Sequence, residues 1–289
     1  SKSLEEDPQY ALAYAGLPDA YSILAWWGWN HRTEGYSKAK EYALKALEID
    51  KNLSDAHAIL GTLLCWSDWK WEEAAEELKL ATELNPNNAN AHQYYSELLD
   101  IIRDNNNARL EINKALELDP FSTAINATSA LYFFNEGKFE EALNTYKKTL
   151  EINPDFIHAY LMQFEIYIKQ QGNDLKAAEA IQKYMLGDSL TIHVANILKE
   201  EYNKAGINGI LTWLIGCQKD YTAAYLYVAK WYAMLGKKKE SLECLKKVIE
   251  LHSSEIPGTN LYPDEIPRIY NSPNFDNLRS EPEFQTILK

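Results

Sequence analysis

The chain has 289 residues, of which 46% are apolar and 25% charged, a composition that argues against global disorder. Its formal net charge of −13 argues against a nucleic-acid-binding surface, because such surfaces need clustered Lys and Arg to neutralise phosphates. No apolar run reaches membrane-spanning length, and the segment Ile210 to Cys217, for example, is far too short.

The sequence predicts a series of helix-pair repeats with a fixed period. The first of them, repeat one, is interrupted by an insertion. Its first helix opens at Tyr10 and meets Pro18, where we expect a kink or a late helix start. Its second helix, around Ala39 and Ala43, comes later than the repeat period demands. The inserted segment 26–36 contains Trp26-Trp27-Gly28-Trp29. We expect these tryptophans either to form a ligand platform or, as we favour, to cover the end of the stack or pack on a missing upstream repeat.

A closing phrase then recurs at a fixed interval. Pro86, Pro120 and Pro154 each end a segment of the form Ala/Thr-x-Glu-Leu/Ile-Asn/Asp-Pro, and they stand 34 residues apart. A period of this length predicts a stack of helix pairs. Residues 3–8 end in a similar phrase, so we expect that the sequence begins inside a repeat of a longer polypeptide.

Two helices are predicted within each period. Ile125 to Glu136 indicates a first helix, Gly137 breaks it, and Phe139 to Ile152 has apolar residues at amphipathic spacing. Pro154 ends the second helix, because proline lacks the amide donor and disfavours helical geometry in the residue before it. Small residues recur where we expect two helices to approach closely: Ala74, Ala81, Ala108, Ala115 and Ala142.

The later repeats vary around this pattern. In repeat three we expect the turn at Asp104-Asn105-Asn106-Asn107, because Asn tolerates left-handed geometry. Repeat five ends without a proline, and Leu211 replaces the usual alanine of repeat six. Repeat seven returns to the pattern and ends near residue 251.

Residues 252–289 have a different composition. Their prolines exclude a long helix, and the capping-box spacing of Ser280 and Glu283 predicts a short terminal helix to Ile287. Phe275 and Phe284 give this tail an apolar side, and the open end of a helix stack needs a cover. We therefore predict two parts, a solenoid over 1–251 and a cap over 252–289 that folds against repeat seven.

The period resembles the tetratricopeptide repeat family. Repeat four carries the family's pattern of large, small and aromatic positions at Asn126, Ala130, Phe133, Ala142, Tyr146, Thr149 and Pro154. The resemblance implies an all-α fold, a right-handed superhelical solenoid of about seven helix pairs with a C-terminal capping tail. The tail, the stretch 10–17 and the tryptophan insertion also resemble the C-terminal repeat regions of bacterial signalling proteins, in which an adenylate-cyclase or winged-helix DNA-binding domain precedes the repeats.

The same resemblance implies where a partner binds. In the family, ligands usually contact four positions of each first helix, on the concave side. Here that set is rich in carboxylates, and its one firm cation is Lys230, so we predict a protein or peptide partner that is basic or mixed basic and apolar. Alternatively, the carboxylates only keep a bare face hydrated. The predicted partner-binding residues are Asp19, Asp55, Gln93, Glu97, Asp100, Phe134, Glu165 and Glu200.

Three functions remain open from the sequence. The first is a non-catalytic scaffold that regulates an upstream effector domain of a bacterial signalling protein. The second is a small-molecule sensor, which a bounded pocket lined by Phe134, Tyr94 and Trp66 favours. The third is a homo-oligomer that associates through the truncated N-terminal end.

Motifs of catalysis are missing from the sequence. It contains no phosphate loop, HExxH, dinucleotide-binding glycine pattern or nucleophile elbow, so we predict no enzymatic activity, cofactor or metal site. His57 and His92 recur at one place in successive repeats, and we interpret them as structural. Three cysteines without CxxC spacing favour a reducing, cytoplasmic compartment, or an extracytoplasmic one if a transmembrane helix lies upstream.

Overall fold

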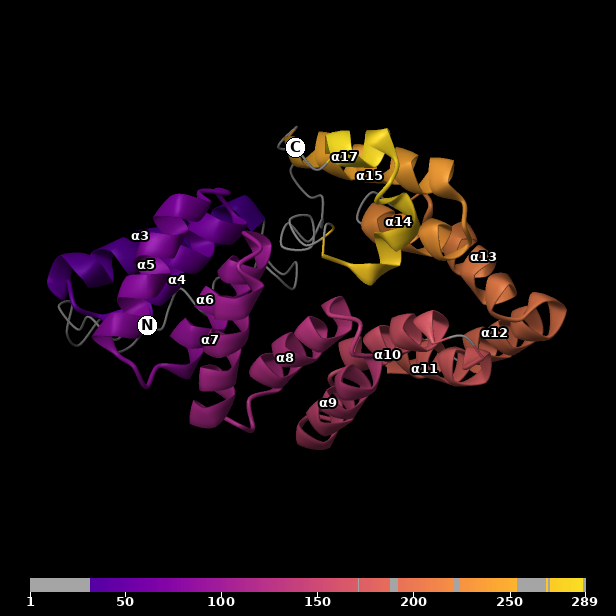
Figure 1. Cartoon of the computed structure of the whole chain (residues 1–289), viewed down its shortest axis with the longest axis horizontal. Helices are drawn as coiled ribbons and strands as arrows, with labels where there is room; N and C mark the ends of the chain where they lie inside the picture. Colours follow the sequence, from indigo (N-terminus) through magenta and orange to yellow (C-terminus); the bar gives the residue numbers. More distant parts are fainter. Residues whose placement is uncertain are drawn as a thin grey trace. The chain divides into compact units, whose positions relative to one another are not determined.

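The computed structural model describes residues 32–170, 172–187, 192–220, 224–253, 269 and 271–287. Within these ranges every element is a helix, which confirms the all-α prediction (Figure 1). None of the described helices is long and apolar enough to cross a membrane. The helices are α3 (Arg32–Ile49), α4 (Ser54–Trp66), α5 (Trp71–Leu84), α6 (Ala89–Ile101), α7 (Asn105–Leu118), α8 (Thr123–Asn135), α9 (Phe139–Ile152), α10 (His158–Lys169), α11 (Asp174–Gly187), α12 (Ile192–Ala205), α13 (Ile207–Gln218), α14 (Tyr225–Met234), α15 (Lys238–Ser253), the 3₁₀-helix η2 (Pro273–Leu278) and α17 (Pro282–Ile287).

The chain divides into two compact units, which we describe separately. Unit 1 comprises residues 1–120 with 256–264, and unit 2 comprises residues 121–255 with 265–289. This division falls between two repeats of the series, directly after Pro120. The sequence analysis placed the division after residue 251, because the proline content changes there.

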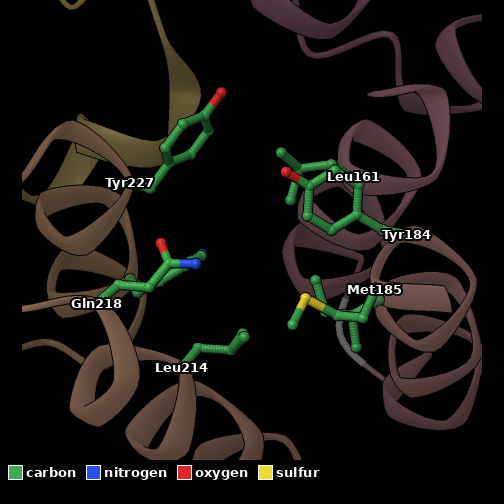
Figure 2. A pocket seen from close by; sticks show the side chains of 8 residues that line it. Leu161, Tyr184, Met185, Leu214, Gln218 and Tyr227 are labelled. Carbon is green, nitrogen blue, oxygen red and sulfur yellow. The ribbon is translucent and has the colours of Figure 1, made fainter. Parts of the chain in front are cut away.

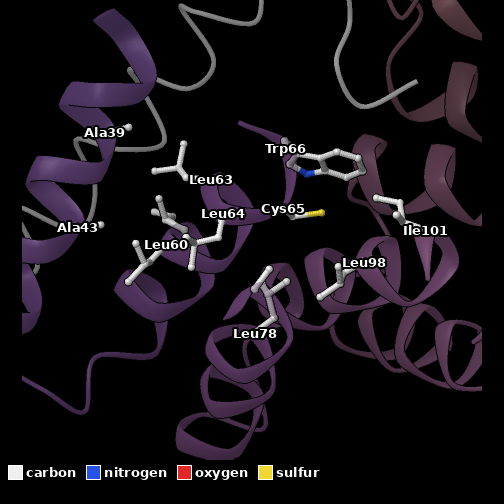
Figure 3. Packing of buried hydrophobic residues seen from close by; sticks show 12 residues of the cluster. Ala39, Ala43, Leu60, Leu63, Leu64, Cys65, Trp66, Leu78, Leu98 and Ile101 are labelled. Carbon is white, nitrogen blue, oxygen red and sulfur yellow. The ribbon is translucent and has the colours of Figure 1, made fainter. Parts of the chain in front are cut away.

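Consecutive helix pairs build unit 1. Helix α4 packs on α5, and α6 packs on α7, as the repeat period predicts. Where α4, α5 and α6 meet, Ala58, Ala81 and Ala91 form a small buried cluster, because only short side chains let three helices approach there. A larger hydrophobic cluster consists of buried residues from α3, α4, α5 and α6 and includes Leu60 and Leu98 (Figure 3).

The beginning of unit 1 is partly described. Helix α3 starts at Arg32, so the last residues of the insertion, 32–36, belong to the second helix of repeat one. The alanines expected in this helix, Ala39, Ala43 and Ala46, are fully buried. Asp19, Pro18 and the tryptophans of the insertion lie outside the described residues.

The turn of repeat three differs from the prediction. Arg103, with φ of 67°, takes the left-handed conformation that we expected of an asparagine. The carboxylate of Asp104 accepts a hydrogen bond from the backbone N–H of Asn107 and caps α7. The three asparagines therefore form the first turn of the helix, where capping by Asp104 stabilises them.

Unit 2 continues the same arrangement. The pairs are α8 with α9, α10 with α11, α12 with α13 and α14 with α15. Helix α9 has the predicted bounds, and α8 begins and ends within two residues of the predicted ones. Asn153, which precedes Pro154, is extended with φ −137° and ψ 96°, as expected of a residue before proline. The five recurrent alanines are at most 2% exposed, which confirms their place between close helices.

The tail of unit 2 forms two short helices, η2 and α17. The rings of Phe275 and Phe284 are fully buried and lie 6.0 Å apart. Glu281 accepts a hydrogen bond from Lys238 of α15 at 2.7 Å, and Glu283 pairs with Lys246 of the same helix. Helix α17 ends at Ile287, as the sequence predicts.

Candidate functional site

In unit 1, three of the predicted partner-binding residues follow one stripe of α6. Gln93, Glu97 and Asp100 are spaced i, i+4 and i+7, which places them on the same side of the helix. The amide Nε2 of Gln93 donates to Glu97 Oε1 at 3.1 Å. Glu97 is half-buried, whereas Gln93 and Asp100 are only 7% and 5% exposed. The stripe is therefore a recessed polar surface with two carboxylates.

Asp55, by contrast, takes part in a contact between repeats. Its Oδ1 accepts a hydrogen bond from Asn88 Nδ2 at 2.7 Å, and the same amide donates to Ser54 Oγ at 2.9 Å. Asn88 Oδ1 accepts from the backbone N–H of Ala91 and caps α6. Asn88 was missed by the sequence analysis, although an asparagine just before a predicted first helix is a signal for a cap.

In unit 2, Glu165 lies on a surface that we call the α10–α14 face, formed by Glu165 and Lys169 of α10 and by Lys230 and Ala233 of α14. Glu165 is 1% exposed, and its Oε1 lies 3.7 Å from Lys230 Nζ. Its Oε2 accepts a hydrogen bond from Asn274 Nδ2 of the tail at 2.7 Å. A buried carboxylate needs such partners, because desolvation disfavours its charged form.

The tail residues 272–278 cover this face. Lys169 Nζ donates to the carbonyl oxygen of Pro273 and lies 4.0 Å from Asp276 Oδ2. Asn277 Nδ2 donates to the carbonyl oxygen of Ala233 at 2.8 Å. The sequence analysis placed the tail against repeat seven alone, whereas the tail also reaches back to α10 of repeat five.

The electrostatics of the α10–α14 face are balanced. Burial lowers the pKa of Lys169, and the neighbouring carboxylates of Asp276 and Glu165 oppose that shift. Two lysines and Glu165 thus share the face with the acidic side chain of Asp276. The α10–α14 face therefore differs from the acidic α6 stripe of unit 1.

The two other predicted residues of unit 2 lie apart from this face. Phe134 of α8 is 1% exposed, and its ring lies 5.8 Å from that of Phe139 inside a hydrophobic cluster. Glu200 is exposed on α12. Neither residue shares a described contact with Glu165.

A small pocket opens between helices α10 and α11 on one side and helices α13 and α14 on the other (Figure 2). Its volume of about 20 Å³ holds a single water molecule, whereas ligand sites occupy roughly 300–1,000 Å³. Lys230 Nζ lies 5.1 Å from the centroid of the Tyr227 ring, so this pocket borders the α10–α14 face. The lining residues are Leu161, Ile181, Tyr184, Met185, Leu214, Gln218, Tyr227 and Trp231. Phe134, Tyr94 and Trp66, which the sequence analysis named for a ligand pocket, do not line it.

The two histidines of unit 1 make equivalent contacts in successive repeats. His57 Nδ1 lies 2.6 Å from Glu77 Oε2, and its Nε2 lies 2.9 Å from the carbonyl oxygen of Lys51. His92 Nδ1 lies 2.5 Å from Glu111 Oε2, and its Nε2 lies 3.1 Å from a backbone carbonyl. A carbonyl only accepts, so the Nε2–H of each histidine ring donates to that backbone carbonyl, and Nδ1 faces the glutamate. The hydrogen bond to Glu111 raises the pKa of His92.

These contacts assign the histidines to the connection between the helices of a repeat. In the part of the chain that the structure describes, no group of three His, Cys, Asp or Glu side chains is arranged to hold a metal ion.

Comparisons with known proteins agree with the repeat pattern. Residues 125–156 match the family described as tetratricopeptide repeat. The chain is 24% identical over 199 residues to the transcriptional regulator HilA of Salmonella typhimurium and, equally, of Salmonella typhi. This match covers 68% of the chain, which spans about a third (35%) of the length of those relatives.

Two solved structures are also similar to this chain, at low sequence identity. Pseudomonas aeruginosa pilF has a TM-score of 0.49 and 17% identity, covering 84% of this chain and 94% of pilF. YrrB, described as a TPR protein with an unusual peptide-binding site, has a TM-score of 0.44 and 21% identity, covering 69% of this chain and 96% of YrrB. Residues 125–156 match a tetratricopeptide repeat, and they lie within a series of helix pairs.

Proposed function

We propose that the chain is a non-catalytic scaffold that binds a protein or peptide through the first helices of its repeats. The observation that carries this proposal is the recessed stripe of Gln93, Glu97 and Asp100 on α6. Charged and amide groups on one side of a first helix are suited to recognition, because their charge and polarity select a complementary partner. Helix pairs that repeat in series supply a surface for such a partner.

The chemistry of this stripe supports a basic or mixed basic and apolar partner for unit 1. Glu97 and Asp100 are carboxylates on the same side of α6, and the side chain of Gln93 already donates to Glu97. A basic or mixed basic and apolar segment complements this arrangement, since Lys or Arg pairs with the carboxylates and apolar side chains displace water around them.

The pocket described in unit 2 gives no support to a small-molecule site. A volume of about 20 Å³ is more than ten times smaller than an ordinary ligand site. An extended segment needs no enclosed cavity, because it lies along a surface and inserts single side chains. The second function considered from the sequence, a small-molecule sensor, thus has less support.

The similarity to HilA supports a regulatory setting for this scaffold. HilA is a transcriptional regulator, and this chain matches about a third of its length. We propose that the chain is the repeat region of a longer bacterial regulatory or signalling protein, in which partner binding alters an effector domain. Association of two chains through the N-terminal end is the alternative, and the oligomeric state of the full-length polypeptide distinguishes the two.

A peptide-display screen tests the partner chemistry. Peptides enriched on the chain should carry Lys or Arg among apolar residues, and their affinity should fall about tenfold or more with Glu97→Lys, since each 1.4 kcal/mol is a factor of ten. Glu76→Lys is the matched control, because Glu76 is an exposed carboxylate on the second helix α5. Enrichment of acidic peptides, or equal losses in both variants, would contradict the proposal.

A further inference from the structure

The contacts of the tail differ from those between neighbouring repeats. Repeats pack helix on helix, whereas η2 has six residues and reaches α10 and α14 through hydrogen bonds. Asn274 and Asn277 supply side-chain amides, and Pro273 supplies a backbone carbonyl. The backbone carbonyl is a group that any peptide segment offers, and the side-chain amides are groups that a segment with Asn or Gln offers.

The spacing of the two asparagines suits this role. In a 3₁₀-helix, side chains at i and i+3 lie one above the other, so Asn274 and Asn277 point to the same side. One amide reaches Glu165 on α10, and the other reaches the carbonyl oxygen of Ala233 on α14. Between them, Phe275 is fully buried against Phe284. The segment therefore joins two first helices that belong to different repeats.

We propose that the α10–α14 face is a second peptide-binding site and that residues 272–278 are its resident ligand, which an outside segment must displace. This inference rests on the proposed function, because it assumes that first helices are the binding surface. According to this inference, unit 2 binds a segment whose chemistry differs from that of the partner of unit 1. The outside segment carries amide side chains at i and i+3 with an aromatic residue directly after the first amide.

The charged groups of the α10–α14 face favour a different ligand from the partner of unit 1. Lys169 and Lys230 flank Glu165, so a Lys- or Arg-rich segment is repelled here, whereas it is attracted by the carboxylates of α6. Neutral amides satisfy Glu165 without adding a further cation. The carbonyl oxygen of Pro273 accepts from Lys169, a contact that any backbone repeats.

Covalent attachment makes the resident tail a strong competitor. A tethered segment has an effective concentration on the order of millimolar, so an outside segment competes only when it binds tightly or when the tail is weakened. The exposed pairs Lys238–Glu281 and Lys246–Glu283 add to the hold of the tail on α15. Weakening the tail should therefore open the face to a peptide added in solution.

The test uses the full chain and a fluorescent peptide of residues 269–289. Asn274→Asp removes the amide donor and places a second carboxylate beside Glu165, so the tail of this variant should leave the face. The peptide, which keeps its asparagine, should bind this variant about ten times more tightly than the parent chain, as measured by fluorescence anisotropy. Asn144→Asp is the matched control, because Asn144 is exposed on α9 of the same unit.

A second variant covers the case in which Asn274→Asp unfolds the chain. Glu281→Lys with Glu283→Lys breaks only exposed pairs, leaves Glu165 and Asn274 unchanged, and should also increase peptide affinity. The same peptide carrying Asp in place of Asn274 should bind neither variant. Equal affinity for parent and variants, or no loss with the Asp peptide, overturns the inference. Because the probe is the chain's own tail, such a failure leaves the Glu97 test of unit 1 unaffected.

Discussion

Asn274 donates a hydrogen bond of 2.7 Å to Glu165, although 109 positions separate the two residues in the sequence. The bond joins the C-terminal tail to the first helix of repeat five. It gives a partner to a carboxylate that is 1% exposed, and an unsatisfied buried carboxylate is strongly unfavourable. The tail therefore contacts α10 of repeat five in addition to covering the last repeat.

Stability should depend on pH through His92. Its pKa is raised in the folded chain, chiefly by the hydrogen bond to Glu111, while burial and Lys114 oppose the shift. This contribution is fully present below the ordinary pKa and disappears as pH rises through the higher, folded-state value. We expect His92→Gln to lower the free energy of unfolding by about 1 kcal/mol near pH 6, and by less near pH 9.

Urea denaturation at both pH values, followed by circular dichroism, measures this difference. His193→Gln serves as the control, because His193 is exposed on α12. A loss of stability with His92→Gln that is the same at both pH values would show that the protonated pair contributes nothing.

Two glycines of α13 should respond oppositely to alanine. A Cβ at Gly209 would lie 2.1 Å from the carbonyl oxygen of Glu201 on α12, so the helices must move apart. A Cβ at Gly216 meets no atom within 4 Å. We expect Gly209→Ala to destabilise the chain by about 1–3 kcal/mol, and Gly216→Ala to stabilise it by up to about 1 kcal/mol. Thermal unfolding of the two variants measures the contrast, and a stabilised Gly209→Ala variant would refute the close approach of α12 and α13.

Replacing Asn88 by Asp should destabilise the chain, although helix caps normally tolerate this substitution. Asn and Asp cap helices equally well, but Asn88 also donates to Ser54 and Asp55. Ser54 already donates to the carbonyl oxygen of Ala81, so its hydroxyl has no hydrogen for a carboxylate. We expect Asn88→Asp to cost about 1–3 kcal/mol.

The reverse change at the next cap provides the comparison for Asn88. Asp104 Oδ1 caps α7 by accepting from the backbone N–H of Asn107, a role that an asparagine oxygen also fills, and only the exposed side-chain bond from Asn107 Nδ2 to Asp104 Oδ2 is lost. Asp104→Asn should therefore change the free energy of unfolding by less than about 0.5 kcal/mol. Chemical denaturation of both variants decides the matter. Equal effects would mean that the contact between Asn88 and Asp55 is unimportant.

The repeated parts of the fold could be predicted because their causes are local. Pro154 ends a helix through its own geometry, and Ala142 marks a close approach because its side chain is short. Such signals return in every period and reinforce one another. The turn at Arg103 was missed because the cap formed by Asp104, rather than residue preference, decides which residue becomes left-handed.

The candidate site was predictable only in part. The register of the first helices identified Gln93, Glu97 and Asp100 as one stripe, because helical spacing alone brings them together. The same register selected Glu165 but gave no sign that Asn274 would meet it. A contact between segments so distant in sequence leaves no periodic pattern, and the short, proline-rich tail offers several ways of packing.

A double-mutant cycle between Glu165 and Asn274 tests the central claim most directly. Glu165→Leu or Asn274→Leu alone leaves one buried polar group without its partner and should cost about 1–3 kcal/mol, whereas replacing both removes the unsatisfied group. We expect the double variant to lose clearly less stability in urea denaturation than the sum of the two single losses. Additive losses would show that the tail does not occupy the α10–α14 face and would contradict the account.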